Sequence, residues 1–143
     1  MLRKSILTVL LFILLSTQGI AAKVKSSIVP LSGGGTVAAN ASVSISLSAV
    51  VPLVTYNVVC YIDTTYPFQY VLMGSSFTDT TSTIISYSLN GNYVMQDQLI
   101  PGHNIAVIVG KFTNPATGYI VFTNLDQTNP FNVNNCFAIP VQV

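Results

Sequence analysis

The sequence predicts an all-β protein: a single β-sandwich of immunoglobulin-like architecture with about seven to nine short strands, one disulfide and a cleaved signal peptide in front. Runs rich in β-branched and aromatic residues recur roughly every 8–15 residues and are separated by Gly, Pro, Asn and Asp. No segment shows the 3.6-residue apolar period of a helix. The chain has two cysteines, Cys60 and Cys136. In an exported chain such a pair is expected to form a disulfide, with two free or reactive thiols as the alternative.

The first twenty-one residues are expected to be a signal peptide. Arg3 and Lys4 precede the apolar stretch Ile6–Leu15, and small residues lead up to Ala21. Cleavage after Ala21 is favoured over cleavage after Ala22, and an uncleaved anchor is the alternative. The apolar stretch is shorter than the roughly 20 residues that a spanning helix needs. We therefore expect an exported protein that is periplasmic, on the cell surface or extracellular, with no stable membrane span after cleavage.

Residues 22–35 are predicted to form an N-terminal extended segment and a glycine-rich joint in front of a sandwich domain at 36–143. Pro30 restricts the segment to a sheet edge or a strand end. The glycines of Ser32–Gly35 favour a flexible joint. Such a tethered segment, Val24–Leu31, is either a short edge strand of its own domain or a strand added to the sheet of a neighbouring subunit.

The first predicted strands of the domain lie between residues 42 and 73. In Ser42–Ser48 apolar residues alternate with serines, which is typical of a strand with one buried and one solvated face. Leu53–Ile62 contains Cys60 and is apolar on both sides of the pleat at Val58 and Val59. A turn is expected over Asp63–Pro67, and the strand Phe68–Met73 follows it.

The clearest hairpin is predicted in the middle of the chain. Thr83–Leu89 leads into Asn90-Gly91 and continues as Asn92–Met95. An Asn-Gly pair between two strands indicates a two-residue turn, because both residues must take positive φ. Pro101-Gly102 predicts the next turn.

The last three predicted strands are Ile105–Val109, Tyr119–Phe122 and Cys136–Val143, and the Asn-rich residues 124–135 are expected to form a loop. Period-2 alternation places Phe137, Ile139, Val141 and Val143 on one face of the last strand. Pro140 predicts that this strand lies at an edge or carries a bulge. The Cys60–Cys136 disulfide would then join an early strand to the last one, and we expect it to cross between the two sheets.

The charge content argues against several classes of function. Only 6% of the residues are charged. After signal cleavage three lysines face four aspartates, a side-chain charge of −1, and no arginine remains. Nucleic-acid binding requires clustered Lys or Arg, so we expect no nucleic-acid partner. A surface so poor in charge favours association with other proteins or with itself.

We expect no enzymatic activity, no metal and no cofactor. The single histidine, His103, is predicted at a turn tip, and as a catalyst it would need Asp97 to orient it. Asp63, Asp79 and Asp126 lie in predicted loops, where aspartate side chains usually bond their own turns. No zinc, calcium or nucleophile-elbow pattern is present.

Two sets of residues are candidates for binding. The first is a candidate face of aromatic residues for a glycan, another ligand or a protein: Tyr56, Tyr61, Tyr66, Phe68 and Tyr70. The second lies on two candidate partner strands that do not alternate: Ile105, Val107, Val109, Tyr119 and Val121. We therefore expect an exported structural or protein-interaction module, which would suit a subunit of a surface or envelope assembly. The alternative is a small β-sandwich module that binds a glycan or another ligand.

Overall fold

The structure is a computed structural model that describes residues 27–66, 69–93 and 96–141; the expected signal peptide lies outside this range. The described residues form eleven strands and one 3-10 helix, and no α-helix occurs among them. The elements are β1 (Val29–Gly33), β2 (Gly35–Val37), β3 (Ser42–Ser46), β4 (Thr55–Thr64), β5 (Gln69–Ser76), β6 (Thr83–Leu89), β7 (Asn92–Tyr93), β8 (Gln96–Leu99), β9 (Gly102–Lys111), η1 (Pro115–Thr117), β10 (Tyr119–Asn124) and β11 (Phe131–Pro140).

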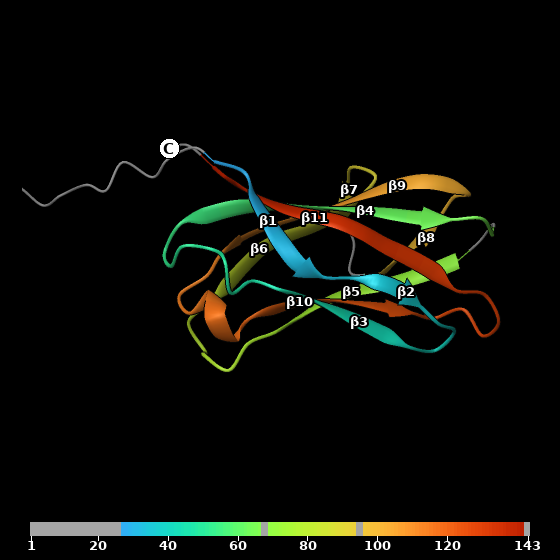
Figure 1. Ribbon diagram of the computed structural model, residues 1–143, viewed down its shortest axis with the longest axis horizontal. Helices are drawn as coiled ribbons and strands as arrows, with labels where there is room; N and C mark the ends of the chain where they lie inside the picture. The colour runs from blue at the N-terminus through green and yellow to red at the C-terminus, as the bar shows by residue number, and fades with distance from the viewer. Residues whose placement is uncertain (1–26, 67–68, 94–95, 142–143) are drawn as a thin grey trace, which may run out of the picture.

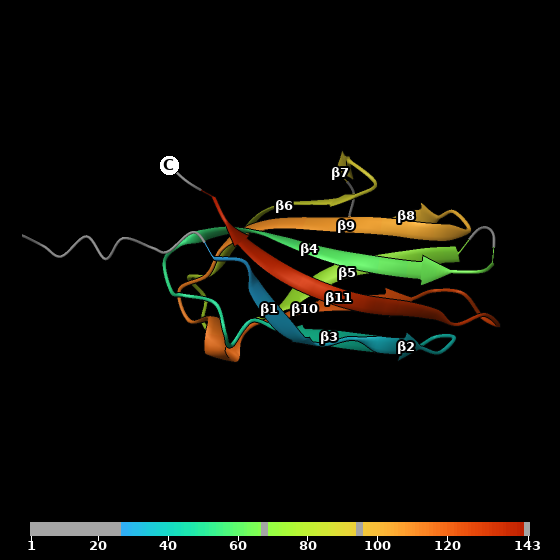
Figure 2. The ribbon, with the colours of Figure 1, turned by 45° about the horizontal axis from the view of Figure 1, so that its top comes forward.

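The strands form two antiparallel layers packed face to face (Figures 1 and 2). The first layer has the order β7-β6-β9-β4-β11, with β2 and the start of β1 on β11. The second layer has the order β3-β10-β5-β8, and the end of β1 pairs with β3. Strand β1 therefore crosses from one layer to the other and closes that side of the sandwich. The predicted all-β sandwich class is confirmed.

The strand order is that of a jelly roll. Strand β1 pairs with β11, β3 with β10, β4 with β9 and β5 with β8, so the chain is one long hairpin whose two arms run side by side. The hairpin is rolled up, which brings β11 against β4 and β10 against β5. Two sheets of order β1-β11-β4-β9 and β3-β10-β5-β8 result, the arrangement of eight-stranded jelly rolls.

Immunoglobulin-type strand order is not what the structure shows. In an immunoglobulin domain the first two strands of the chain lie side by side in one sheet and the last two in the other. Here the last two strands, β10 and β11, belong to different layers. Eleven strands also exceed the seven to nine expected, partly because β2 and β7 contain only three and two residues.

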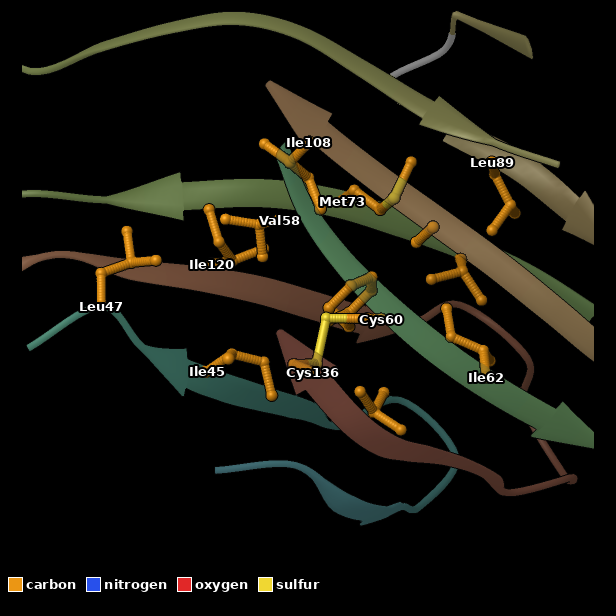
Figure 3. Packing of buried hydrophobic residues seen from close by; sticks show 14 of the residues in the cluster. Ile45, Leu47, Val58, Cys60, Ile62, Met73, Leu89, Ile108, Ile120 and Cys136 are labelled. Carbon is orange, nitrogen blue, oxygen red and sulfur yellow. A yellow bond between two sulfur atoms is a disulfide. The ribbon is translucent and has the colours of Figure 1, made fainter. Parts of the chain in front are cut away.

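Side chains from both layers fill a single core (Figure 3). Val58, Ile62 and Ile108 enter from the first layer, and Ile45 and Ile120 from the second; all five are fully buried. Removal of their apolar area from water is the main force that holds the layers together.

The predicted disulfide is formed. Cys60 on β4 is bonded to Cys136 on β11, and the two residues are register partners with Cα atoms 4.2 Å apart. The bond therefore lies within the first layer, not between the two sheets as expected. Figure 3 shows it at the inner side of that layer, among the core residues.

The expected flexible joint at Ser32–Gly35 is part of the sheets. Leu31 pairs with β11, Ser32 and Gly33 pair with β3, and Gly35 returns to β11. Gly33, Gly34 and Gly35 all have positive φ, which lets the chain leave one layer and return within three residues. Residues 29–35 are thus an integral part of the sandwich, and Val29–Leu31 is a strand of its own domain.

Several predicted boundaries differ from the structure. The hairpin prediction is correct: β6 spans Thr83–Leu89, and Asn90 and Gly91 both have positive φ. The expected turn at Pro101-Gly102 is wrong in part, because β9 already begins at Gly102. The turn expected from Asp63 is also displaced, since β4 continues to Thr64.

The last strand is longer and more central than expected. It begins at Phe131, inside the predicted loop, and lies between β4 on one side and β1 and β2 on the other, so it is not an edge. A bulge is present, but it lies between Val133 and Cys136, away from Pro140. The start of this strand is determined by its long-range pairing with β4, which the Asn-rich local sequence does not indicate.

Candidate functional site

The outward side of the first layer is apolar over its central strands. In β4 the residues Tyr56, Val58, Cys60 and Ile62 point into the core, so the residues between them point outward. The same alternation applies to β9 and β11, and Pro30 of β1 is the register partner of Phe137. We call the resulting set of outward apolar side chains the apolar outer face: Pro30, Val59, Tyr61, Ile105, Val107, Val109, Phe137 and Ile139.

The register places these side chains next to one another. Phe137, Val59 and Val107 are directly opposite each other on three neighbouring strands. Tyr61 is opposite Ile105 on the next outward row. Tyr61, Ile105 and Ile139 retain 43%, 42% and 38% exposure, so the described part of the chain leaves this face open to solvent.

The outward side of the second layer is mixed, with serines on β3 and aromatic or aliphatic side chains on β5 and β10: Tyr70, Leu72, Tyr119 and Val121. Strand β3 presents Ser42, Ser44 and Ser46 there, and the hydroxyls of Ser42 and Thr123 are hydrogen-bonded at 2.8 Å. Tyr119 and Val121 of β10 lie on this side, between serines and a glycine on the flanking strands. The five candidate partner-strand residues are thus divided: Ile105, Val107 and Val109 share the apolar outer face, whereas Tyr119 and Val121 lie on the opposite side of the molecule.

The candidate aromatic face is not assembled as a single surface. Tyr56 is a core residue, and the backbone N–H of Val51 donates a hydrogen bond to its hydroxyl at 3.3 Å. Tyr61 lies on the apolar outer face, whereas Tyr70 on β5 is exposed in the second layer. Tyr66 is exposed just after β4, and Phe68 lies outside the described residues.

A groove of about 500 Å³ is present at the end of the sandwich where β4 ends and β9 begins. We call it the end groove; its lining residues are Thr36, Asp63, Thr64, Thr65, Tyr66, Gly102, His103, Pro130, Phe131 and Asn132. Tyr66 provides an exposed aromatic ring, and the Thr36 hydroxyl donates a hydrogen bond to the Asn132 side chain at 2.7 Å. The lining thus combines the aromatic rings of Tyr66 and Phe131 with amide, hydroxyl, imidazole and carboxylate groups.

The carboxylate of Asp63 joins three strands at this groove. One of its oxygens contacts Nδ1 of His103 on β9, and the other accepts a hydrogen bond from the Asn134 side chain on β11. The sequence did not suggest this cluster, because His103 and Asp63 were both expected in turns and Asp97 was the expected partner of His103. Only the pairing of β4 with β9 brings position 63 opposite position 103.

The other two aspartates in loops bond their own turns, as expected. Asp79 accepts hydrogen bonds from the Ser82 hydroxyl and from the backbone N–H groups of Ser82 and Thr81, and together these lower its pKa. The backbone N–H groups of Thr128 and Asn129 lower the pKa of Asp126 in the same way. Both loops are thus stabilised by a carboxylate.

The described residues contain no group of three or more His, Cys, Asp or Glu side chains that could bind a metal ion. Within the same residues, none of the helical segments has the length and apolarity to cross a membrane. Comparison with protein-family models, with curated proteins and with solved structures finds no match. The candidate sites therefore have to be judged on their own geometry.

Proposed function

We propose that this protein is an exported, non-enzymatic structural or protein-interaction module that binds a protein surface through its apolar outer face. The observation that carries this proposal is the contiguous apolar outer face, where Phe137, Val59 and Val107 are in register on β11, β4 and β9. An antiparallel sheet with a solvated outer side normally has polar residues there. A contiguous apolar patch indicates an interaction site.

Export is supported by two independent features. The Cys60–Cys136 disulfide suits an oxidising compartment, since disulfides are rare in reducing cytosol. The N-terminal sequence has the pattern of a signal peptide. Periplasm, cell surface and extracellular space all fit both features, and a subunit of an envelope or surface assembly would work there.

Site-specific photo-cross-linking tests the proposal. A photo-reactive residue in place of Val107, at the centre of the apolar outer face, is expected to trap a protein when the chain is expressed in its natural cellular setting. The matched control carries the same residue in place of Ser44, at an outward position of the second layer. Equal cross-linking from both positions, or none from position 107, would contradict the proposal.

A second candidate function, a small module that binds a glycan or another ligand, is favoured by the end groove. A volume of about 500 Å³ lies within the usual range of ligand sites. An exposed tyrosine beside carboxylate, amide and hydroxyl groups suits a neutral sugar, because the ring covers its apolar side while polar groups bond its hydroxyls.

A glycan array decides whether this second function holds. If it does, Tyr66→Ala removes binding and Asp63→Asn weakens it. The control is Tyr119→Ala, which truncates a tyrosine of the same 41% exposure far from the groove. The absence of any glycan signal, or an equal effect of all three variants, excludes the glycan function.

A further inference from the structure

The geometry points to a second copy of this chain as the occupant of the apolar outer face. The two copies pack first layer against first layer, related by a two-fold axis that runs across the strands at Val59 and Val107. This arrangement brings Lys111 of each copy next to Asp63 and His103 of the other. The inference rests on the proposed function for the use of this face, and it adds the identity of the partner.

The face has an apolar centre. Strands β4 and β9 present five outward rows, defined by their register: Thr55 with Lys111, Asn57 with Val109, Val59 with Val107, Tyr61 with Ile105, and Asp63 with His103. The middle row consists of two valines, and Phe137 on β11 is in register with it. A two-fold axis through this row packs the most apolar part of the face against itself.

The charges lie at the two ends of the same face. Lys111 is exposed in the first row and is the only Lys or Arg among the residues that the structure describes. Among the same residues it has no ion-pair partner. Asp63 lies in the last row, and both end rows are four residues from the middle. Four residues of a strand span about 13 Å, so a copy turned end to end places Lys111 over the row of Asp63 and His103.

The same charges select the direction of the axis. A two-fold axis parallel to the strands would keep each row over the same row of the other copy, so the two Lys111 side chains would share one row and lie far from Asp63. Like charges face to face are unfavourable, whereas opposite charges in register favour the arrangement across the strands. The face is therefore self-complementary in one orientation only.

The available area is sufficient for a dimer. The patch comprises β11, β4 and β9, with ten residues each, and β6, with seven. At the usual strand spacings these strands cover about 600 Å² per copy. Two copies would bury about 1,200 Å², which exceeds the roughly 1,000 Å² expected of a specific interface. Aligned sheets in natural sandwiches already pack in this manner, about 10 Å apart.

The experiment uses the oxidised protein with single cysteine substitutions and a short thiol cross-linker. Mixed K111C and H103C chains are expected to cross-link to each other, and V107C to itself, because Val107 lies at the axis. S44C is the control on the opposite side and is expected not to cross-link. Sedimentation analysis is expected to show a dimer, and V107D is expected to weaken its association at least tenfold while S44D does not.

The outcomes separate this inference from the proposed function. The K111C–H103C product together with a dimer supports the second copy. A monomer at roughly 100 μM, where even a weak dimer would be populated, overturns it. So does cross-linking of K111C to K111C, which requires the other axis. Capture of a different protein alone at position 107 overturns the second copy but leaves the proposed function in place.

Discussion

At the residue scale, Asp79 and Asp126 stabilise the loops in which they lie. Each accepts hydrogen bonds from backbone N–H groups two and three residues further along the chain. A carboxylate is a stronger acceptor than an amide or a hydroxyl, and it is available only when ionised. The loops β5–β6 and β10–β11 are therefore sensitive to pH.

Stability is expected to fall in acid because of these two groups. The hydrogen bonds of Asp79, led by the Ser82 hydroxyl, and those of Asp126, led by the Thr128 N–H, lower both pKa values below the ordinary 3.8. A lowered pKa in the folded state stabilises the fold above pH 3.8, and this stabilisation is lost as pH falls through the folded-state pKa.

Urea unfolding across pH 7 to 2 measures this effect. The double variant Asp79→Asn with Asp126→Asn is expected to be less stable than the natural chain at pH 7 and to lose less stability on acidification. Asp97→Asn removes one carboxylate outside the two turns and is the matched control for each of the two single variants. Parallel pH profiles for the natural chain and the double variant would contradict the assignment.

Strand β1 shows at the element scale how a glycine run can be structural instead of flexible. A Cβ on Gly33 would lie 2.3 Å from the Ser44 carbonyl oxygen, and one on Gly34 would lie 2.6 Å from that of Val133. Both glycines also have positive φ. The run therefore allows close backbone contact with both layers at the point where β1 crosses between them.

Alanine substitutions in this run are expected to destabilise the protein in a defined order. Gly34→Ala combines positive φ with a clash against backbone, Gly35→Ala has positive φ with open space, and Gly74→Ala has open space and no positive φ. We expect Gly34→Ala to lower the free energy of unfolding by roughly 3 kcal/mol or more and Gly35→Ala to lower it by about 1 kcal/mol. For Gly74→Ala we expect a change close to zero. Thermal or urea unfolding gives the order, and equal losses at positions 34 and 74 would argue for a flexible joint.

At the scale of the whole molecule, the disulfide connects β4 to the last strand, β11. Cys60 and Cys136 are 76 positions apart and both buried. A bond that closes so long a loop restricts the unfolded chain strongly, by about 4–5 kcal/mol in the chain-entropy account. The value is comparable to the whole stability of a small domain.

Removal of this bond is therefore expected to leave the fold marginal. Replacement of Cys60 and Cys136 by alanine should lower the free energy of unfolding by about 2–5 kcal/mol, measured by urea unfolding. A reducing agent should destabilise the natural chain and have no effect on the double variant, which serves as the internal control. A natural chain whose stability does not respond to full reduction would refute the role of the bond.

The sequence alone determined the all-β class, the hairpin at Asn90-Gly91, the turns of Asp79 and Asp126 and the Cys60–Cys136 pair. Each depends on alternation, on a turn dipeptide or on cysteine count, and such local features can be recognised along the chain. The outward apolar run of Ile105, Val107 and Val109 was also visible, although not which side of the molecule it would occupy.

Tertiary structure alone decided the jelly-roll order, the contact of Asp63 with His103, and the separation of Tyr119 and Val121 from the apolar outer face. All three follow from pairings between strands far apart in the chain, β4 with β9 and β10 with β3. Single-strand patterns give the two faces of each strand but not its neighbours. Which strands pair depends on the burial of one common core, which only the complete fold provides.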